Sequence, residues 1–524
     1  MLLAALAVLA LVAGTSAAGV VDPLNGPYPQ AHGEMVTGIP ATKACTVTVV
    51  KDFRFHNTAY GADKPFEGDY VPTCTGPWAK VVMTMSAKVK TGTQFDRIGD
   101  VLVGGVTLLH LTTPEGESGE TDWSIQRDVT DYASVLKERQ PAYFIIGNQT
   151  DGTYTGDFFG TLSFTFYATG AKAAAAVAPD EVLGLSPGVD KGLPTRSGDK
   201  PLTSTVTVPH NTTSLVGEVF ASGHGAEEED WWNAPFVCAS GGIPYREVSI
   251  KVDGKLAGIA PVYPTLYTGG YGPDFWRPIP SPRALNLRPY RFDLTPFVGE
   301  LTDDATHRID IAVIGQGGCD GYWFLGGNLL VTTNHKDSGR TQGALISSTG
   351  AAAPTSTTLG LQGDTLSDKT TSAHHLVTKG WFKVPGGART DVTVVQDMTN
   401  DAVDAALDVK ASWTWTSSTT RTDGVKSSQS SAYSLLRTGP TWTLTDDQDT
   451  SSTAAGRTVT SSLRDTMSTG GPVVGITGVV GASHESWVYS TSTGICVDHE
   501  LVAAVQNTVV DKVSDSCSAL PVRA

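Results

Sequence analysis

The chain has 524 residues, of which 40% are hydrophobic and 17% charged, and its formal net charge is −16. That length exceeds what one hydrophobic core usually organises, so about three domains are expected. The acidic balance and the lack of a Lys/Arg cluster in the sequence exclude nucleic acid as a partner. Frequent Gly, Pro, Thr and Ser, without long Glu/Lys-rich helical segments, favour an all-β architecture with many turns.

Residues 1–18 have the pattern of a secretory signal peptide. Leu2 to Ala13 form an apolar run, and Gly14 to Ala18 supply small residues for cleavage. The usual basic residue after Met1 is missing, and a short buried helix or a membrane anchor is the alternative. The run is too short to span a bilayer, and no other stretch approaches the roughly 18 apolar residues that spanning requires. We therefore predict a secreted, extracellular protein with no membrane partner.

The six cysteines are consistent with an oxidising compartment. Pairing of sequence neighbours would place one disulfide in each expected domain, namely Cys45–Cys74, Cys238–Cys319 and Cys496–Cys517. Six cysteines allow many connectivities, so this pairing is a preference rather than a deduction. No CxxC or Cys/His spacing indicates zinc, and we expect neither a metal nor a cofactor.

Residues 40–170 predict a first β domain. Cys45 to Val50 and Trp78 to Val89 are typical of strands. The most distinctive part runs from Thr93 to Tyr167, where QFDRI at 94–98 leads into an apolar strand. The low-complexity Ala-rich segment that follows predicts a linker over 171–200, although an Ala run is also compatible with a short helix.

Residues 201–335 predict a second domain. Residues 245–252 alternate as a strand does and turn at 253–254, which is a hairpin pattern. The long loop 261–289 is rich in Gly, Pro and aromatic residues, and loops of this length usually have a function. RFDLTPF at 291–297 is similar to RDVTDY at 127–132, a weak repeat that indicates two domains of one kind. Residues 338–524, rich in Thr and Ser, predict a third, β-rich domain without candidate chemistry.

Several long motifs in the first two segments resemble one enzyme family. They are FDRIGDVLVGGVTLL, ETDWSIQRDVTDY, GNQTDGTYTGDF, PYREVSIKVDGKLAG, YTGGYGPDFWRPI, YRFDLTPFVG and GGNLLV. Over residues 40–335 the chain resembles the peptide-N-glycanase A type amidases, which cleave the amide between asparagine and the first N-acetylglucosamine of an N-linked glycan. It is more distantly similar to glycopeptidase F. The resemblance implies two tandem jelly-roll β-sandwich domains packed side by side, followed by a β-rich C-terminal domain.

The resemblance also implies a catalytic pair. Phe95-Asp96-Arg97 matches the triplet that carries the catalytic aspartate, so Asp96 is the expected base for the attacking water. Arg97 is expected to hold Asp96 or to bind the glycan, and a surface ion pair is the alternative for these two residues. The family's second-domain glutamate precedes the arginine matched by Arg246, but that place here is near Gly242. Glu247 is the nearest substitute, with a solvent-facing strand residue as the alternative.

A further set of side chains is expected to bind the substrate. Asn148 aligns roughly with a first-domain glutamate of glycopeptidase F. The residues expected to stack on or hydrogen-bond the glycan are Trp123, Asn148, Trp231, Trp232, Arg246, Asp274, Trp276 and Arg277, together with Arg97. Core burial is the alternative for Trp123, and turn stabilisation is the alternative for Asp274. The run Glu227 to Asp230 is interpreted as a solvated acidic turn, since it lacks the spacing of a calcium loop.

The resemblance thus implies a metal-independent, monomeric amidase acting on N-glycoproteins or glycopeptides. It would release the glycan as a glycosylamine and leave aspartate behind. A non-catalytic carbohydrate-binding or adhesion protein would need the Trp-bearing loops but not Asp96, and a two-carboxylate glycosidase would use Asp96 and Glu247. Because every matched motif precedes residue 335, residues up to about Thr333 are expected to suffice for activity.

Overall fold

We describe the fold from a computed structural model of the chain. It describes the backbone of residues 31–32, 36, 38–56, 64–114, 120–185, 195–197, 201–225, 227–228, 245–262, 267, 284–315, 321–352, 356–362, 365–405, 408–424, 432–445, 451–453, 456–468, 479–490, 494–505 and 508–514. Within these ranges, side chains are described up to residue 350 and from 370 to 399, except at 31–32 and 195–197.

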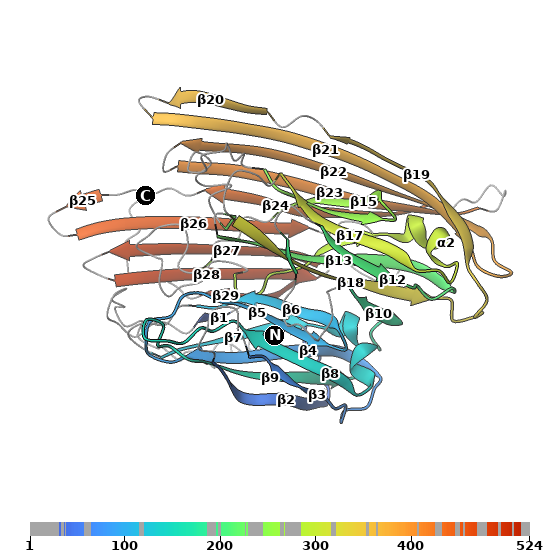
Figure 1. The fold of residues 1–524 in the computed structure, drawn as a ribbon, viewed down its shortest axis with the longest axis horizontal. Helices are drawn as coiled ribbons and strands as arrows, with labels where there is room; N and C mark the ends of the chain where they lie inside the picture. The colour runs from blue at the N-terminus through green and yellow to red at the C-terminus, as the bar shows by residue number, and fades with distance from the viewer. Residues whose placement is uncertain are drawn as a thin grey trace, which may run out of the picture.

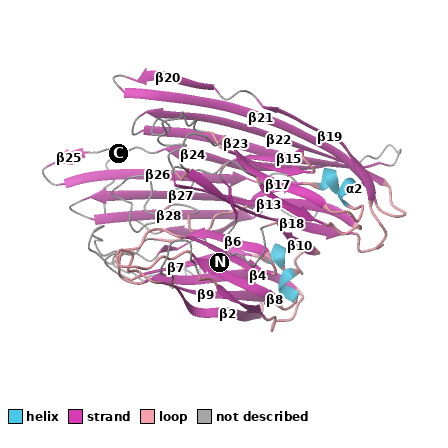
Figure 2. Cartoon of the chain, in the orientation of Figure 1, coloured by secondary structure: helices cyan, strands magenta, loops and turns pink. Residues whose placement is uncertain are grey.

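The described chain consists of β-sheets with a few short helical segments (Figure 2). Almost all neighbouring strands are antiparallel. The predicted all-β class is therefore confirmed, while the jelly-roll connectivity stays a prediction. In the described part of the chain, no helix has the length and apolar character required to cross a bilayer.

The first domain is a sandwich of two sheets, drawn in blue to cyan in Figure 1. One sheet has the order β1 (Ala31–His32), β7 (Thr121–Asp128), β4 (Trp78–Val89), β9 (Phe158–Ala168) and β2 (Ala44–Phe55). The other has the order β3 (Phe66–Tyr70), β8 (Gln140–Ile146), β5 (Ile98–Val103) and β6 (Val106–Thr112). Strand β9 alternates buried and partly exposed residues, so one face supplies the core between the sheets. Two 3-10 turns, Thr130–Tyr132 and Val135–Lys137, precede β8.

The second domain also has two sheets. The first contains β10 (Glu181–Gly184), β18 (Gly321–Thr333), β13 (Thr212–Gly225) and β16 (Tyr290–Asp293), and β11 (Thr195–Ser197) also pairs with β18. The second contains β12 (Leu202–Val206), β17 (His307–Ile314), β14 (Glu247–Val252) and β15 (Lys255–Pro261). A 3-10 turn, Thr295–Phe297, and the short helix α2 (Val298–Leu301) follow β16. Since β10 and β11 fall within 171–200, the segment predicted as a linker adds strands to this domain.

The C-terminal residues form one eleven-stranded sheet, coloured amber to red in Figure 1. Its main path is β19 (Gln342–Ala352), β21 (Thr365–Lys383), β22 (Arg389–Ala405), β23 (Asp408–Gly424), β24 (Ala432–Thr445), β26 (Gly456–Ser468), β27 (Val479–Ser490), β28 (Gly494–Val505) and β29 (Thr508–Ser514). Strand β20 (Ser356–Gln362) pairs with β21, and β25 (Ser451–Thr453) pairs with β26.

This sheet shares a core with the second domain. Phe382, Val392, Val394 and Met398 are buried in the same apolar cluster as the second domain's strands. The side chain of Gln396 also accepts a hydrogen bond from the backbone of Ile259, at 2.8 Å. The boundary predicted near residue 338 therefore does not separate two hydrophobic cores.

The first two domains meet along β6. Its outer edge is paired by residues 284–287 of the second domain, because Leu287 donates to the His110 carbonyl at 2.9 Å and Thr112 donates to that of Ala284 at 3.1 Å. Thr107, at the start of β6, exchanges two hydrogen bonds with the side chain of Asn328, at 3.0 and 2.9 Å. The interface thus combines strand-like backbone hydrogen bonds with hydrogen bonds to a buried side chain.

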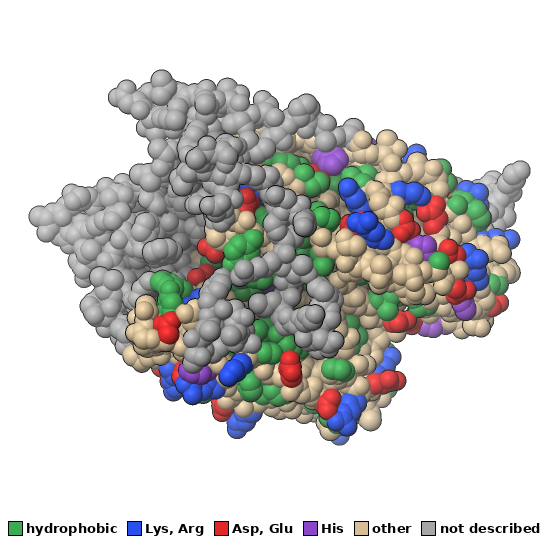
Figure 3. All heavy atoms as spheres, viewed as in Figure 1, with side chains coloured by type: hydrophobic (Ala, Val, Ile, Leu, Met, Phe, Trp, Pro, Cys, Tyr) green, Lys and Arg blue, Asp and Glu red, His purple; other side chains and the backbone are tan. Residues whose placement is uncertain are grey.

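A buried glutamate joins the two repeat motifs found in the sequence. Glu218 accepts hydrogen bonds from Tyr132, at 2.6 Å, and from Arg291, at 2.8 Å. Arg291 also forms an ion pair with Asp131 at 2.8 Å. The DVTDY segment of the first domain and the YRFDLTPF segment of the second therefore meet at one interface. In the view of Figure 3, acidic and basic side chains are interspersed over the described surface.

Candidate active site

Asp96 precedes β5 and faces the second domain. Its carboxyl is half-buried, and this loss of solvation is the main reason that its pKa is raised to about 7. The negative charge of Glu228 raises the pKa of Asp96 further, while Arg97 and a backbone N–H oppose the shift. Asp96 and Glu228, one from each domain, are therefore near enough for their charges to interact, and we refer to them as the carboxylate pair.

A glycine-rich turn after β13 positions Glu228. Gly225 has φ of +65°, a conformation that favours glycine, and Glu228 N–H donates to its carbonyl at 3.0 Å. A Cβ on Gly223 would lie 1.8 Å from the carbonyl oxygen of Glu227, so a larger residue would displace the turn. The run predicted as a solvated acidic turn thus supplies the partner of Asp96. The sequence signal that was available is the SGHG motif followed closely by three glutamates.

Glu227 holds this turn in place through hydrogen bonds to buried side chains. Its two carboxylate oxygens accept from Arg246 at 2.6 and 2.8 Å, and Trp323 Nε1 donates to it at 3.1 Å. Arg246 is 0% exposed. The guanidinium is buried in a bidentate ion pair that stabilises the turn, and its role in substrate binding stays a prediction.

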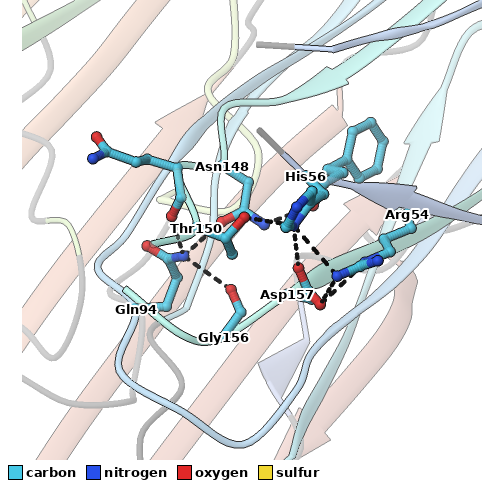
Figure 4. Close-up of polar contacts among 9 residues, drawn as sticks. Arg54, His56, Gln94, Asn148, Thr150, Gly156 and Asp157 are labelled. Atoms are coloured by element: carbon cyan, nitrogen blue, oxygen red, sulfur yellow. Dashed lines mark hydrogen bonds and ion pairs between the residues drawn. The ribbon is translucent and has the colours of Figure 1, made fainter. Parts of the chain in front are cut away.

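Arg97 lies beside Asp96 on a polar support. Its Nε donates to Gln94 Oε1 at 2.9 Å, and its guanidinium lies 5.2 Å from the ring centroid of Tyr154. Figure 4 shows Gln94 bonded to Asn148 and to Gly156, at 2.5 and 2.9 Å. The Gln94 amide is thereby held with its oxygen available to Arg97.

Asn148 lies beneath Gln94 in the same polar support. It is buried, and besides accepting from Gln94 it donates to the Phe55 carbonyl at 2.6 Å. Both ends of its amide are therefore engaged with the protein. Asn148 therefore positions Gln94, and through it Arg97, while its predicted contact with a substrate stays a prediction.

Glu247 does not join Asp96. It is buried on β14, accepts a hydrogen bond from Tyr245, and lies 2.8 Å from Nδ1 of His374. His374 belongs to β21, so this carboxylate connects the second domain to the C-terminal sheet. The predicted pairing of Glu247 with Asp96 is not what the structure shows, because β14 directs Glu247 toward β21.

Trp123 lies in the core of the first domain. It is 1% exposed and packs edge-to-face on Phe158, with ring centroids 5.8 Å apart. This supports the core interpretation over sugar stacking. The remaining predicted binding residues lie outside the described residues; they are Trp231, Trp232, Asp274, Trp276 and Arg277.

The disulfide between Cys45 and Cys74 is present, with Cα atoms 5.9 Å apart. Cys238, Cys319 and Cys517 lie outside the described residues, as do residues 1–18. Cys496 lies in β28, where only the backbone is described. The other two predicted disulfides therefore stay predictions.

Comparison with known proteins places this site in a family. Residues 35–350 match the family model described as peptide N-acetyl-beta-D-glucosaminyl asparaginase amidase A. A curated relative, the peptide-N4-(N-acetyl-beta-glucosaminyl)asparagine amidase A of Prunus dulcis, is 29% identical over 340 residues. That match covers 59% of this chain and 57% of the relative, so the chain spans little more than half of the relative's length.

Two solved structures are similar in part. One is PNGF-II, at 15% identity and a TM-score of 0.41, with 56% of this chain and 65% of the other covered. The other is recombinant peptide:N-glycanase F, at 14% identity and a TM-score of 0.38, with 56% of this chain and 96% of the other covered.

Proposed function

The chain belongs to the peptide N-acetyl-beta-D-glucosaminyl asparaginase amidase A family, and from this premise we propose that it is a secreted amidase acting on N-glycopeptides or N-glycoproteins. The bond cleaved is the amide between the asparagine side chain and N-acetylglucosamine. The products are a glycosylamine and an aspartate in the peptide. The observation that carries this proposal is the carboxylate pair of Asp96 and Glu228 between the two domains.

Hydrolysis of this amide requires a proton acceptor for water and a proton donor for the leaving nitrogen. With the pKa of Asp96 near 7, the pair holds one proton in mildly acidic solution. We assign that proton to Asp96 and the ionised role to Glu228. The role of base that the sequence suggested for Asp96 alone then belongs to the pair.

Glu228 takes a proton from water, and the hydroxide oxygen bonds to the amide carbon. The C–N bond then breaks as Asp96 gives its proton to the nitrogen, and the new carboxylic acid returns a proton to Asp96. Arg97, held by Gln94, offers N–H groups beside the pair for the developing oxyanion. Activity should fall as the pH rises above about 7, because the pair then loses its acid.

The decisive experiment is mass spectrometry of a defined N-glycopeptide incubated with the protein in ¹⁸O-labelled water. The proposal expects aspartate carrying ¹⁸O in place of asparagine, and a released 1-amino glycan. A glycosidase would leave asparagine or a sugar stub on the peptide, and a binding module would leave the mass unchanged. Either result would overturn the proposed function.

Secretion is tested separately. Expression in a secreting host should place the protein in the medium, with its N-terminus near Gly19 by Edman sequencing. Retention in the cell with an intact first segment would contradict that part of the proposal. Native mass spectrometry of the same material would test the expected monomer.

A further inference from the structure

A buried line of side chains crosses the domain interface and ends at Glu228. Asp100 on β5 contacts His110 on β6, with 2.7 Å between Oδ1 and Nδ1. His110 Nε2 lies 2.7 Å from the Ser222 hydroxyl on β13, which lies 2.8 Å from His224 Nε2. His224 Nδ1 is 3.5 Å from Glu228 Oε1. The first four residues are all buried.

The surroundings of this line are largely aromatic near its exposed end. The His224 ring stacks on Tyr267, with centroids 5.4 Å apart, and meets Phe324 edge-to-face at 5.0 Å. Among the described residues, the charged groups near this end are Glu228 itself, Asp96 across the interface, and the Glu227–Arg246 ion pair.

At the other end of the line, Oδ2 of Asp100 has no hydrogen-bond partner among the described atoms. Burial raises the pKa of Asp100, and His110 opposes that rise. A proton placed on Asp100 is therefore compatible with this position.

Each of the three hydrogen bonds from Asp100 to His224 has room for one hydrogen, so the hydrogens must be ordered along the line. The fourth link, from His224 to Glu228, is a longer contact of 3.5 Å that a hydrogen bond would shorten. If Asp100 is ionised, His110 donates to it from Nδ1 and accepts from Ser222, and His224 donates to Ser222 from Nε2. His224 Nδ1 is then an acceptor, and Glu228 must hold a proton to bond it. If Asp100 is protonated, every bond reverses, and His224 Nδ1–H donates to ionised Glu228. Both orders contain the same number of protons.

We propose that Asp100, His110, Ser222 and His224 form a proton relay that clears the proton from Glu228 to Asp100. In the transfer, the Glu228 proton passes to His224 Nδ1, and the His224 Nε2 proton passes to Ser222. The Ser222 proton passes to His110 Nε2, and the His110 Nδ1 proton passes to Asp100. Each intermediate group loses one proton and gains one, so no ion remains between the ends. This leaves Glu228 ionised for the next water, and in that respect the inference rests on the proposed function. The reverse transfer returns the proton from the buried Asp100 to Glu228, whose partly exposed carboxyl releases it to solvent, so the line is reset for another turnover.

The relay predicts that the two histidine rings are tautomerically matched. Whenever His110 carries its proton on Nδ1, His224 carries its proton on Nε2, and the reverse order holds after transfer. In both orders each ring carries one proton, so the relay requires two neutral rings. Long-range ¹H–¹⁵N spectra of ¹⁵N-histidine-labelled full-length protein report this without any catalytic assay.

Ser222→Ala removes the hydroxyl at the centre of the line and should uncouple the two rings. Ser249→Ala is the matched control, since Ser249 is a buried serine on β14 whose hydroxyl donates to the Ala312 carbonyl at 3.4 Å. Ser222→Thr keeps the hydroxyl and should restore the coupled tautomers. Separate titration of the two rings in the wild type, an imidazolium at either ring near pH 6, or unchanged rings in Ser222→Ala would each overturn the relay.

Kinetics supply the second readout. Ser222→Ala should lower kcat by about tenfold or more, and should change its pH profile, with KM little changed. Ser249→Ala should behave as wild type in both assays. If the wild type leaves glycopeptide asparagine intact, the proposed function fails while the spectra still decide the relay. If it converts asparagine but the rings are uncoupled, the relay alone fails.

Discussion

Asp96 and Glu228 come from different domains, so neither carboxylate has a charge independent of the other. We predict that Asp96→Asn and Glu228→Gln each lower kcat by roughly 10²–10⁴-fold, because each removes one partner in proton transfer. Steady-state kinetics on a glycopeptide measure this. Asp122→Asn, an exposed change on β7, is the control. Full turnover by a folded Asp96→Asn protein would remove Asp96 from the mechanism.

The raised pKa of Asp96 also makes a prediction about stability. Because the folded-state pKa is about 7 against an ordinary 3.8, the folded protein binds this proton more tightly than the unfolded chain does. This tighter proton binding adds to the free energy of unfolding. The contribution is fully present below about pH 4 and is lost as the pH rises through about 7. Asn does not titrate, so the free energy of unfolding of Asp96→Asn at pH 8 should exceed that of the wild type by about 1 kcal/mol. The difference is modest because the carboxyl is partly exposed.

Urea unfolding at about pH 4, 6 and 8 would measure that difference. The free energy of unfolding of Asp96→Asn, relative to wild type, should increase steadily over this range. For Asp122→Asn the corresponding difference should change much less. A pH-independent difference for Asp96→Asn would show that the pKa of Asp96 is not raised in the folded protein.

At this scale the sequence identifies Asp96 and Arg97 as candidates but does not identify their contacts. Asn148 and Arg246 occupy positions that look like substrate ligands, yet each is buried and engaged with the protein. The sequence does not indicate Glu228 as a catalytic residue, because it lies in an acidic run and such a run usually indicates a solvated turn. Only the interdomain geometry shows that one glutamate of that run faces Asp96 while its neighbour Glu227 pairs beneath.

At the scale of the elements, the turn after β13 is the most sensitive to side-chain volume. Gly223→Ala should displace this turn, because its new Cβ would collide with the Glu227 carbonyl. We expect a loss of about 1–3 kcal/mol in stability and a fall in kcat, since Glu228 would move relative to Asp96. Gly152→Ala is the control, as its Cβ would have no neighbour within 4 Å. A Gly223→Ala protein with wild-type activity would show that the position of the turn does not matter for catalysis.

Individual strands were well predicted where alternation or an apolar run was pronounced. The segments around β4, β5 and β14 agree with the sequence, because β4 has a buried face and β5 and β14 are buried along almost their whole length. The segment 171–200 was mistaken for a linker because β10 and β11 are short edge strands with little alternation. Their pairing with β18 involves residues more than a hundred positions later, which local pattern does not reveal.

For the whole molecule, the shared core changes the expectation that the first 333 residues suffice for activity. A chain ending at Asn334 would expose the apolar surface that Phe382, Val392 and Val394 cover. We predict that it shows no cooperative thermal transition and binds a dye specific for exposed apolar surface. A chain ending at Ala405, which retains β21 and β22, should regain a cooperative transition. A cooperative, soluble chain ending at Asn334 would contradict the prediction.

The sequence does not reveal this dependence, since the Thr/Ser-rich composition of the third segment suggested an accessory domain. The apolar alternation of β22 is visible in VTVV at 392–395, but the surface that covers it is not. Burial of such a face depends on packing against β15 and the turn before α2, which are far away in the sequence.

Strand β13 has a consequence for biosynthesis. Its partner β18 ends at Thr333, so after Gly225 leaves the ribosome the chain must grow by about a hundred residues before the pair can close. At about 5–20 residues per second, this edge stays open for roughly 5–20 s. The first domain is complete at Ala168, so it can fold before β18 has been synthesised. Ser222, His224 and Glu228 are therefore the last residues of the site to reach their positions. A nascent chain is expected to carry no assembled site until translation has passed Thr333.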